Sequence, residues 1–162
     1  MTAQATEILL FEGEELSLSN EPLEHFLDNQ PPPVKFMSPH TALWRGYIGT
    51  WSIEGERLYL KKLQATILDE VSGGLRDVGL DAVFPGFPDG VFAHWFSGEL
   101  RCARGALLKY VHVGFGSVYE RDLFFKVKKG VVIDRREVVN GVAPEGVHDS
   151  DDIEALVDVR RD

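Results

Sequence analysis

The sequence contains almost no cysteine and no long hydrophobic run. One of its 162 residues is cysteine, Cys102, so no disulfide can form within the chain. Nothing near Cys102 in the sequence would lower the pKa of a thiol, and we expect a small core residue there rather than a nucleophile. No apolar segment approaches the roughly 20 residues that a membrane-spanning helix needs. The sequence therefore predicts no membrane association.

Basic charge and targeting signals are also scarce. The formal net charge is -9, whereas sequence-independent binding of nucleic acid needs a basic surface. The first residues, MTAQATEILLF, lack the basic start and long apolar core of a signal peptide. We therefore expect a cytoplasmic protein that binds no nucleic acid, and the charge favours a basic protein as partner.

Signatures of common chemistry are missing as well. The chain has no glycine-rich phosphate loop and no nucleophile elbow. The histidines do not have the spacing of zinc ligands, and the acids at Asp149, Asp151 and Asp152 lack the glycine and glutamate of a calcium loop. We predict no metal, no cofactor and no catalytic residue.

What the sequence does contain is strand patterns. About nine of them, with one to three short helices, predict a mainly β fold: an antiparallel curved sheet, an open barrel or a two-layer sandwich. The length favours a single domain over residues 1–162. Residues 141–162 form an acidic C-terminal segment, which we expect to be mobile or a short helix.

Several turns are predicted by local residues. Residues 43–63 form a hairpin that reverses around Glu54-Gly55, with Trp51 opposite either Leu58 or Tyr59. The glycines within its first strand, Gly46 and Gly49, indicate a bulge or a sharp bend. Three further features are a hairpin near residues 7–19, a short helix with Asn20 as cap and Pro22 in its first turn, and a turn at residues 128–130.

Residues 91–127 predict three consecutive antiparallel strands. The turns are placed at Ala103-Arg104-Gly105 and at residues 114–117. Leu108 then lies opposite Leu123, and one face carries a ladder of alternating charges, in which Lys109 lies between Glu99 and Asp122.

On the opposite face, polar side chains gather at one end of these strands. The candidate ligand-binding residues are His94, Tyr110, His112, Tyr119 and Arg121. Buried polar groups must be hydrogen-bonded, hydrated or open to a ligand. Two interpretations stay open: core histidines with Arg121 paired to Glu120 or Glu99, or a pocket for an anionic or polar ligand.

Candidate partner-binding residues are Trp95, Phe124, Trp44 and Arg45. Trp95 and Phe124 fall on the charged face of the three strands, and aromatic side chains among charges are typical of interface anchors. A second sheet that covers this face explains them equally well. Arg45 can stack on a ligand ring or on the rings of its neighbours.

Three segments, TALWRGYIGTW, DGVFAHWFSGELR and YVHVGFGSVYERDLFF, resemble small uncharacterised bacterial proteins. The similarity covers residues 40–132 and implies a bacterial, β-rich, single-domain protein. No activity is known for that family, so the resemblance assigns no role to any residue.

Two functional hypotheses follow. The first is a non-enzymatic acidic bacterial interaction protein, such as an immunity-type partner of a basic protein, and a homodimer is compatible with it. The alternative is a small-molecule binding protein or acid–base enzyme that uses the histidine, tyrosine and arginine cluster.

Overall fold

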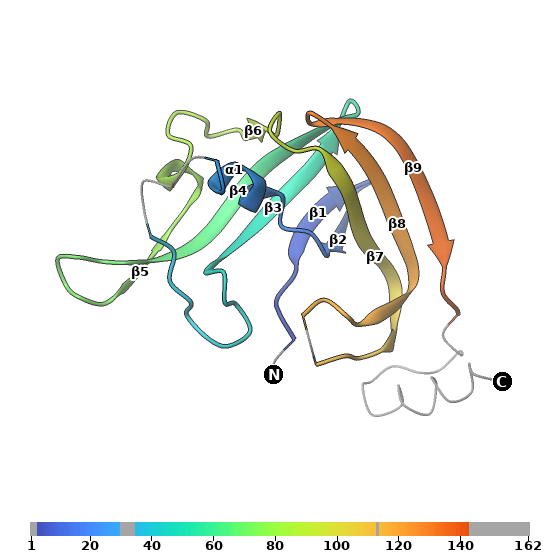
Figure 1. Cartoon of the computed structure of the whole chain (residues 1–162), viewed down its shortest axis with the longest axis horizontal. Coiled ribbons are helices and arrows are strands. Elements are labelled where there is room, and N and C mark those ends of the chain that lie inside the picture. Colours follow the sequence, from blue (N-terminus) through green and yellow to red (C-terminus); the bar gives the residue numbers. More distant parts are fainter. Residues whose placement is uncertain (1–2, 30–34, 113, 143–162) are drawn as a thin grey trace.

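The computed structural model describes residues 3–29, 35–112 and 114–142, and Figure 1 shows its arrangement. All nine strands belong to one sheet. Seven of them close into a ring in the order β3-β1-β2-β7-β8-β9-β4, because β4 also pairs with β3. The remaining two, β5 and β6, extend the sheet from β4. The predicted mainly β fold is therefore confirmed, with a ring as its architecture.

The strands are β1 (Glu7–Phe11), β2 (Glu14–Leu18), β3 (Tyr47–Glu54), β4 (Arg57–Leu68), β5 (Leu75–Val78), β6 (Val91–Phe92), β7 (Gly98–Lys109), β8 (Val118–Lys128) and β9 (Val131–Val139). The described helical segments are α1 (Pro22–Leu27) and a 3-10 turn (Leu80–Ala82). One pair of neighbours, β1 and β3, is parallel, whereas the other pairs of strands are antiparallel.

The β3–β4 hairpin reverses at the predicted place, with Glu54 opposite Arg57. Trp51, however, lies opposite Leu60 and not opposite Leu58 or Tyr59. A bulge between Thr50 and Trp51 shifts the register there, in agreement with the irregularity that the strand glycines indicated.

The turns around β1–β2 and β8–β9 are also confirmed, and α1 begins at Pro22 as predicted. Asn20 does not cap this helix. Its side chain instead bonds to β7, accepting from the Arg101 N–H at 2.7 Å and donating to the Glu99 carbonyl at 3.0 Å. A short polar side chain beside a helix start can bond to any nearby backbone group, and here the neighbouring strand is that group.

The segment from 91 to 127 differs from the prediction. β7 continues through residues 103–105 without turning, and the register shifts between Arg104 and Leu107. Gly105 has the expected positive φ, +88°, but it serves a bulge inside a long strand. Consequently Leu123 lies opposite Cys102 and not Leu108.

The predicted charge ladder is wrong for the same reason. Asp122 lies opposite Ala103, Lys109 opposite Val118, and Glu99 opposite Lys126. Because β7 does not turn at residues 103–105, Glu99 and Lys109 belong to one strand and cannot face each other across the sheet.

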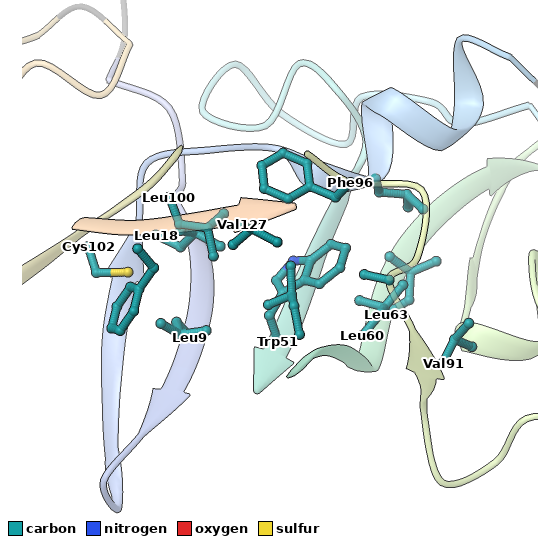
Figure 2. Packing of buried hydrophobic residues seen from close by; sticks show 14 of the residues in the cluster. Leu9, Leu18, Trp51, Leu60, Leu63, Val91, Phe96, Leu100, Cys102 and Val127 are labelled. Carbon is teal, nitrogen blue, oxygen red and sulfur yellow. The ribbon is translucent and has the colours of Figure 1, made fainter. Parts of the chain in front are cut away.

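Side chains from most strands fill the interior of the ring. Trp51, Phe96 and Phe125 are among the largest fully buried groups, and leucines from β1, β2, β4 and β7 surround them (Figure 2). Each fully buried leucine or phenylalanine contributes about 1.5–3 kcal/mol relative to an exposed one. The ring is thus a packed core, as in other small closed sheets.

Two predictions concern the chain as a whole. No helix among the described residues is long and apolar enough to cross a membrane. The single domain stays a prediction, and residues 143–162 of the acidic C-terminal segment lie outside the described residues.

The buried thiol gives a direct test of this core. Cys102 is fully buried, and burial raises its pKa to about 12. Because the thiolate is the reactive form, we expect the native protein at pH 8 to react with a disulfide reagent at least about a hundredfold more slowly than the protein unfolded in guanidinium chloride. The absorbance of the released thiolate measures both rates. Fast reaction without denaturant would contradict the packing around Cys102.

Candidate functional site

Four of the five candidate ligand-binding residues lie toward one end of β7 and β8, and His94 lies apart from them. His94 lies exposed in the loop after β6, while Tyr110 and His112 lie exposed beyond the other end of β7. β7 has 12 residues, which corresponds to about 40 Å of extended strand between His94 and Tyr110. Tyr110 and His112 do contact each other edge-to-face, with ring centroids 4.4 Å apart.

Tyr119 and Arg121 lie on β8, opposite Leu107 and Val139. The Arg121 guanidinium donates to the Glu137 carboxylate at 3.0 Å. Arg121 thus pairs with a carboxylate, as the structural interpretation expected, but the partner is on β9. The predicted placement of His94 beside the other four residues depended on a turn at residues 103–105, which β7 does not make. Ligand binding by any of the five residues stays a prediction.

Three of the four candidate partner-binding residues, Trp95, Phe124 and Arg45, pack against their own chain. Trp95 stacks on Phe84 with centroids 5.4 Å apart, and its Nε1–H donates to the Pro22 carbonyl at 2.9 Å. The Arg136 guanidinium covers the Phe124 ring at 3.9 Å from the centroid. Trp44, in contrast, is 55% exposed. Trp95 faces inward because it belongs to the loop before β7 and not to the strand.

The fourth candidate, Arg45, takes part in a buried ion pair. Its side chain is 7% exposed, and Nη2 donates to Glu7 Oε2 at 2.8 Å. Its Nε lies 3.5 Å from a carboxylate oxygen of Glu21. The guanidinium also lies 5.5 Å from the centroid of the Tyr47 ring. Arg45 packs on its neighbours, which was one of the two interpretations of this residue.

The Glu7 carboxylate is the centre of this network. It is completely buried and accepts two further hydrogen bonds, from the Gly49 N–H at 2.7 Å and from Trp51 Nε1 at 3.1 Å. Burial raises the pKa of Glu7, and Arg45 and the other donors oppose that rise. Burial also raises the pKa of Glu21. An ion pair without water contact fixes geometry more effectively than it adds stability.

A second buried contact extends the network to α1. The Tyr47 hydroxyl donates to Glu24 at 2.6 Å, and burial together with this bond raises the pKa of Tyr47 far above its ordinary value. The phenol therefore keeps its proton at any physiological pH. A hydroxyl that is held in this way positions α1 and does not transfer protons.

Sequence reasoning missed Glu7. The signal was present, because Glu7 and Leu9 share one face of a strand whose Leu9 side is apolar. An acid at the core face of a strand requires a buried donor, and Arg45 is 38 residues away in the sequence.

Gly49 gives the sharpest test of the network. A Cβ at this position would lie 2.7 Å from both Glu7 Oε1 and Trp51 Nε1. We expect Gly49→Ala to lower the free energy of unfolding by about 2–4 kcal/mol, because neither buried group can move away freely. Urea denaturation measures this. The control is Gly74→Ala, whose Cβ would meet its nearest neighbour at 3.6 Å and should change stability by less than about 0.5 kcal/mol. Equal effects would contradict a rigid network.

Loss of Arg45 should leave a charge buried without its partner. We expect Arg45→Met to cost about 3–5 kcal/mol, and we expect the double variant Glu7→Gln/Arg45→Met to be more stable than Arg45→Met alone. A double-mutant cycle by chemical denaturation measures the coupling. Additive effects of the two substitutions would contradict a direct ion pair.

Outside the ring, negative charge collects on one projection, which we call the acidic arm: residues 68–89, from the end of β4 through β5 and the 3-10 turn. The β4–β5 hairpin extends away from the ring (Figure 1). The arm contains five acids and one base, whereas the other described residues contain fourteen acids and fourteen bases. The described residues outside the arm are thus neutral in sum, and the arm carries the charge excess of the described residues.

The arm also exposes large apolar side chains. Val71 at the hairpin tip is 97% exposed, and Leu68, Leu75 and Phe87 are each exposed to about half. Isolated apolar side chains on a surface are normal, but four within one charged projection are typical of a contact surface.

The tip of the arm is ordered by its own hydrogen bonds. The Asp69 carboxylate accepts from the Val71 N–H and from the Ser72 hydroxyl, both at 3.1 Å. These bonds lower the pKa of Asp69, so this carboxylate is charged at neutral pH. At the base of the arm, buried Phe84 packs on Trp95. The tip of the arm is therefore ordered by local hydrogen bonds, and its base is packed on a neighbouring aromatic side chain.

Two shallow hollows flank β5. One, of about 470 Å³, is lined by Arg76, Asp77 and Asp81 together with apolar neighbours. The other, of about 270 Å³, shares Asp77 and has Leu43, Leu63 and Val78 in its walls. A carboxylate beside apolar walls suits the charged head and apolar stem of a lysine or arginine side chain.

Within the described ranges, no group of three His, Cys, Asp or Glu side chains is arranged to hold a metal ion. No protein-family model, curated protein or solved structure matches this chain. The resemblance to a bacterial family stays a prediction.

Proposed function

We propose that this chain is a non-enzymatic binding protein whose acidic arm docks on a basic protein. The observation that carries this proposal is the separation of charge within the described residues: an arm with five acids, one base and exposed apolar side chains, and a remainder in which acids and bases balance. A charge concentrated in one projection steers association with an oppositely charged surface.

The apolar side chains of the arm supply contacts that slow dissociation, which charge alone does not. Rim charges mainly raise association rates, whereas buried apolar anchors slow dissociation. Val71, Leu75 and Phe87 stand among the acids of the arm as such anchors. Because the tip is ordered by Asp69, little conformational entropy is lost on binding.

An immunity-type role is the specific form of this proposal. A toxin that acts on nucleic acid carries a basic surface for the phosphates, and an acidic arm can cover that surface. The alternative, a small-molecule binder or acid–base enzyme, is supported less, since His94 lies apart from its other four candidate residues.

Charge reversal tests whether the arm, and not the net charge of the whole chain, attracts a basic partner. The arm variant is Glu70→Lys/Asp81→Lys. The control is Glu15→Lys/Asp28→Lys, which changes the net charge by the same amount at exposed positions outside the arm. The probe is a labelled peptide of alternating lysine and leucine, followed by fluorescence anisotropy at two salt concentrations. We expect the arm variant to bind at least about tenfold more weakly and the control to change by less than about threefold.

Equal weakening by both variants would show that net charge, and not the arm, attracts the peptide, and it would contradict the proposal. The same pair of variants then serves to identify the natural partner. A basic protein that co-purifies with the unaltered chain and with the control, but not with the arm variant, meets the expectation.

A further inference from the structure

The last strand of the ring is paired on one side only for most of its length. β9 pairs with β8 between Val131 and Val139, with a register shift at Ile133, which has no partner on β8. On its other side it meets β4 at one residue pair, Arg57 with Val131, and the Val132 N–H donates to the Glu56 carbonyl at 2.8 Å. Beyond Val132, no strand in the described ranges pairs with this edge. Figure 1 shows β9 as the outermost strand on this side.

The free edge is rich in strand-forming apolar residues. Ile133 is 53% exposed and Val139 is 60% exposed, and Val131 and Val138 are also exposed. Natural proteins usually protect such an edge with charges or proline. The charges present on β9 are directed back to their own sheet: Arg135 bonds to Glu56, and Arg136 lies over Phe124.

The direction of the backbone groups along β9 follows from two hydrogen bonds. The Asn140 N–H donates to the carbonyl of Glu120 on β8 at 2.7 Å. The Arg135 N–H instead bonds to the side chain of Asp134 at 2.9 Å. Because N–H groups alternate along a strand, those of Glu137 and Val139 point to the free edge.

The sequence of β9, VVIDRREVV, has apolar ends and a charged centre, so an antiparallel copy can place apolar residues opposite apolar residues. In a two-fold antiparallel pair centred on Arg136, Ile133 lies across from Val139 of the second copy. Arg135 then lies across from Glu137, and symmetry repeats both contacts. Centring the pair on Arg135 or on Glu137 would instead place like charges opposite each other in the hydrogen-bonded row.

Arg136 would lie across from its own copy in this register. Each Arg136 guanidinium is already held over Phe124 and 3.3 Å from Glu99 on its own sheet. Its charge is therefore compensated within each chain.

We propose that the free edge of β9 is a homodimer interface, in which two copies of this chain pair antiparallel, centred on Arg136, and join their sheets. The interface is isologous, since the same strand serves both copies. Backbone hydrogen bonds supply affinity, and the alternating side chains supply register. This surface does not include the acidic arm, so the proposal does not depend on the proposed function.

Sedimentation velocity of the full chain, between about 1 and 300 µM, tests the interface. We expect a dimer whose fraction rises with concentration. The variant Ile133→Lys/Val139→Lys should raise the dissociation constant at least about tenfold, since it places four lysines in the joined edge. The control Val71→Lys/Leu75→Lys adds the same charge on the arm and should leave the dimer unchanged. Circular dichroism verifies that each variant is folded.

Charge exchange tests the register. Arg135→Glu should weaken the dimer, and Arg135→Glu/Glu137→Arg should restore its dissociation constant to within about threefold. The exchange does not restore the contacts of these residues with Glu56 and Arg121 within the chain, so rescue reports contact between copies. A chain that stays monomeric over this range, as it would if residues 143–162 covered the edge, overturns the proposal. Equal weakening by both lysine pairs, or failure of the rescue, also overturns it.

Discussion

The buried contact between Glu7 and Arg45 determines how the N-terminal strand closes the ring. β1 lies between β2 and β3, and its parallel pairing with β3 covers three residue pairs, from Ile8 with Thr50 to Leu10 with Ser52. Such a short pairing specifies its own register weakly. A carboxylate withdrawn from water costs several kcal/mol unless donors surround it, and the observed register brings Arg45, Gly49 and Trp51 to Glu7. The network therefore selects one closure of the ring from several that apolar packing alone would allow.

The same network connects the ring to the acidic arm. Arg45 lies beside Glu21 at the start of α1, and Trp95 bonds to the first residue of that helix, Pro22. Trp95 in turn stacks on Phe84, at the base of the arm. Side-chain contacts and one hydrogen bond to a backbone carbonyl form this path, which connects the base of the arm to the ring through α1. A charged projection that is fixed in this way presents its acids in one arrangement, which is what specific recognition of a basic surface requires.

Local signals predicted the elements of this fold, but not their long-range pairing. The reversal at Glu54-Gly55 and the turn at residues 128–130 lie where the residues placed them. Gly105 was ambiguous because a positive φ serves a hairpin turn and a bulge equally well, and the long partner strand β8 decides between them. The predicted cluster of histidine, tyrosine and arginine side chains depended on a hairpin turn at Gly105. The Glu7–Arg45 contact spans 38 residues, which no local pattern reveals. The charge of the arm, in contrast, can be counted from the sequence once its boundaries are known.

The arm and the free edge of β9 lie at opposite ends of the long axis of the molecule (Figure 1). Pairing through β9 would therefore leave both arms exposed, one at each end of the dimer. Two arms on one assembly bind a partner that repeats, such as an oligomer or a clustered surface, with an avidity that exceeds the affinity of either arm. For a monomeric basic partner, the same geometry allows one copy per arm without steric conflict. The ring then serves as a spacer that separates the two arms.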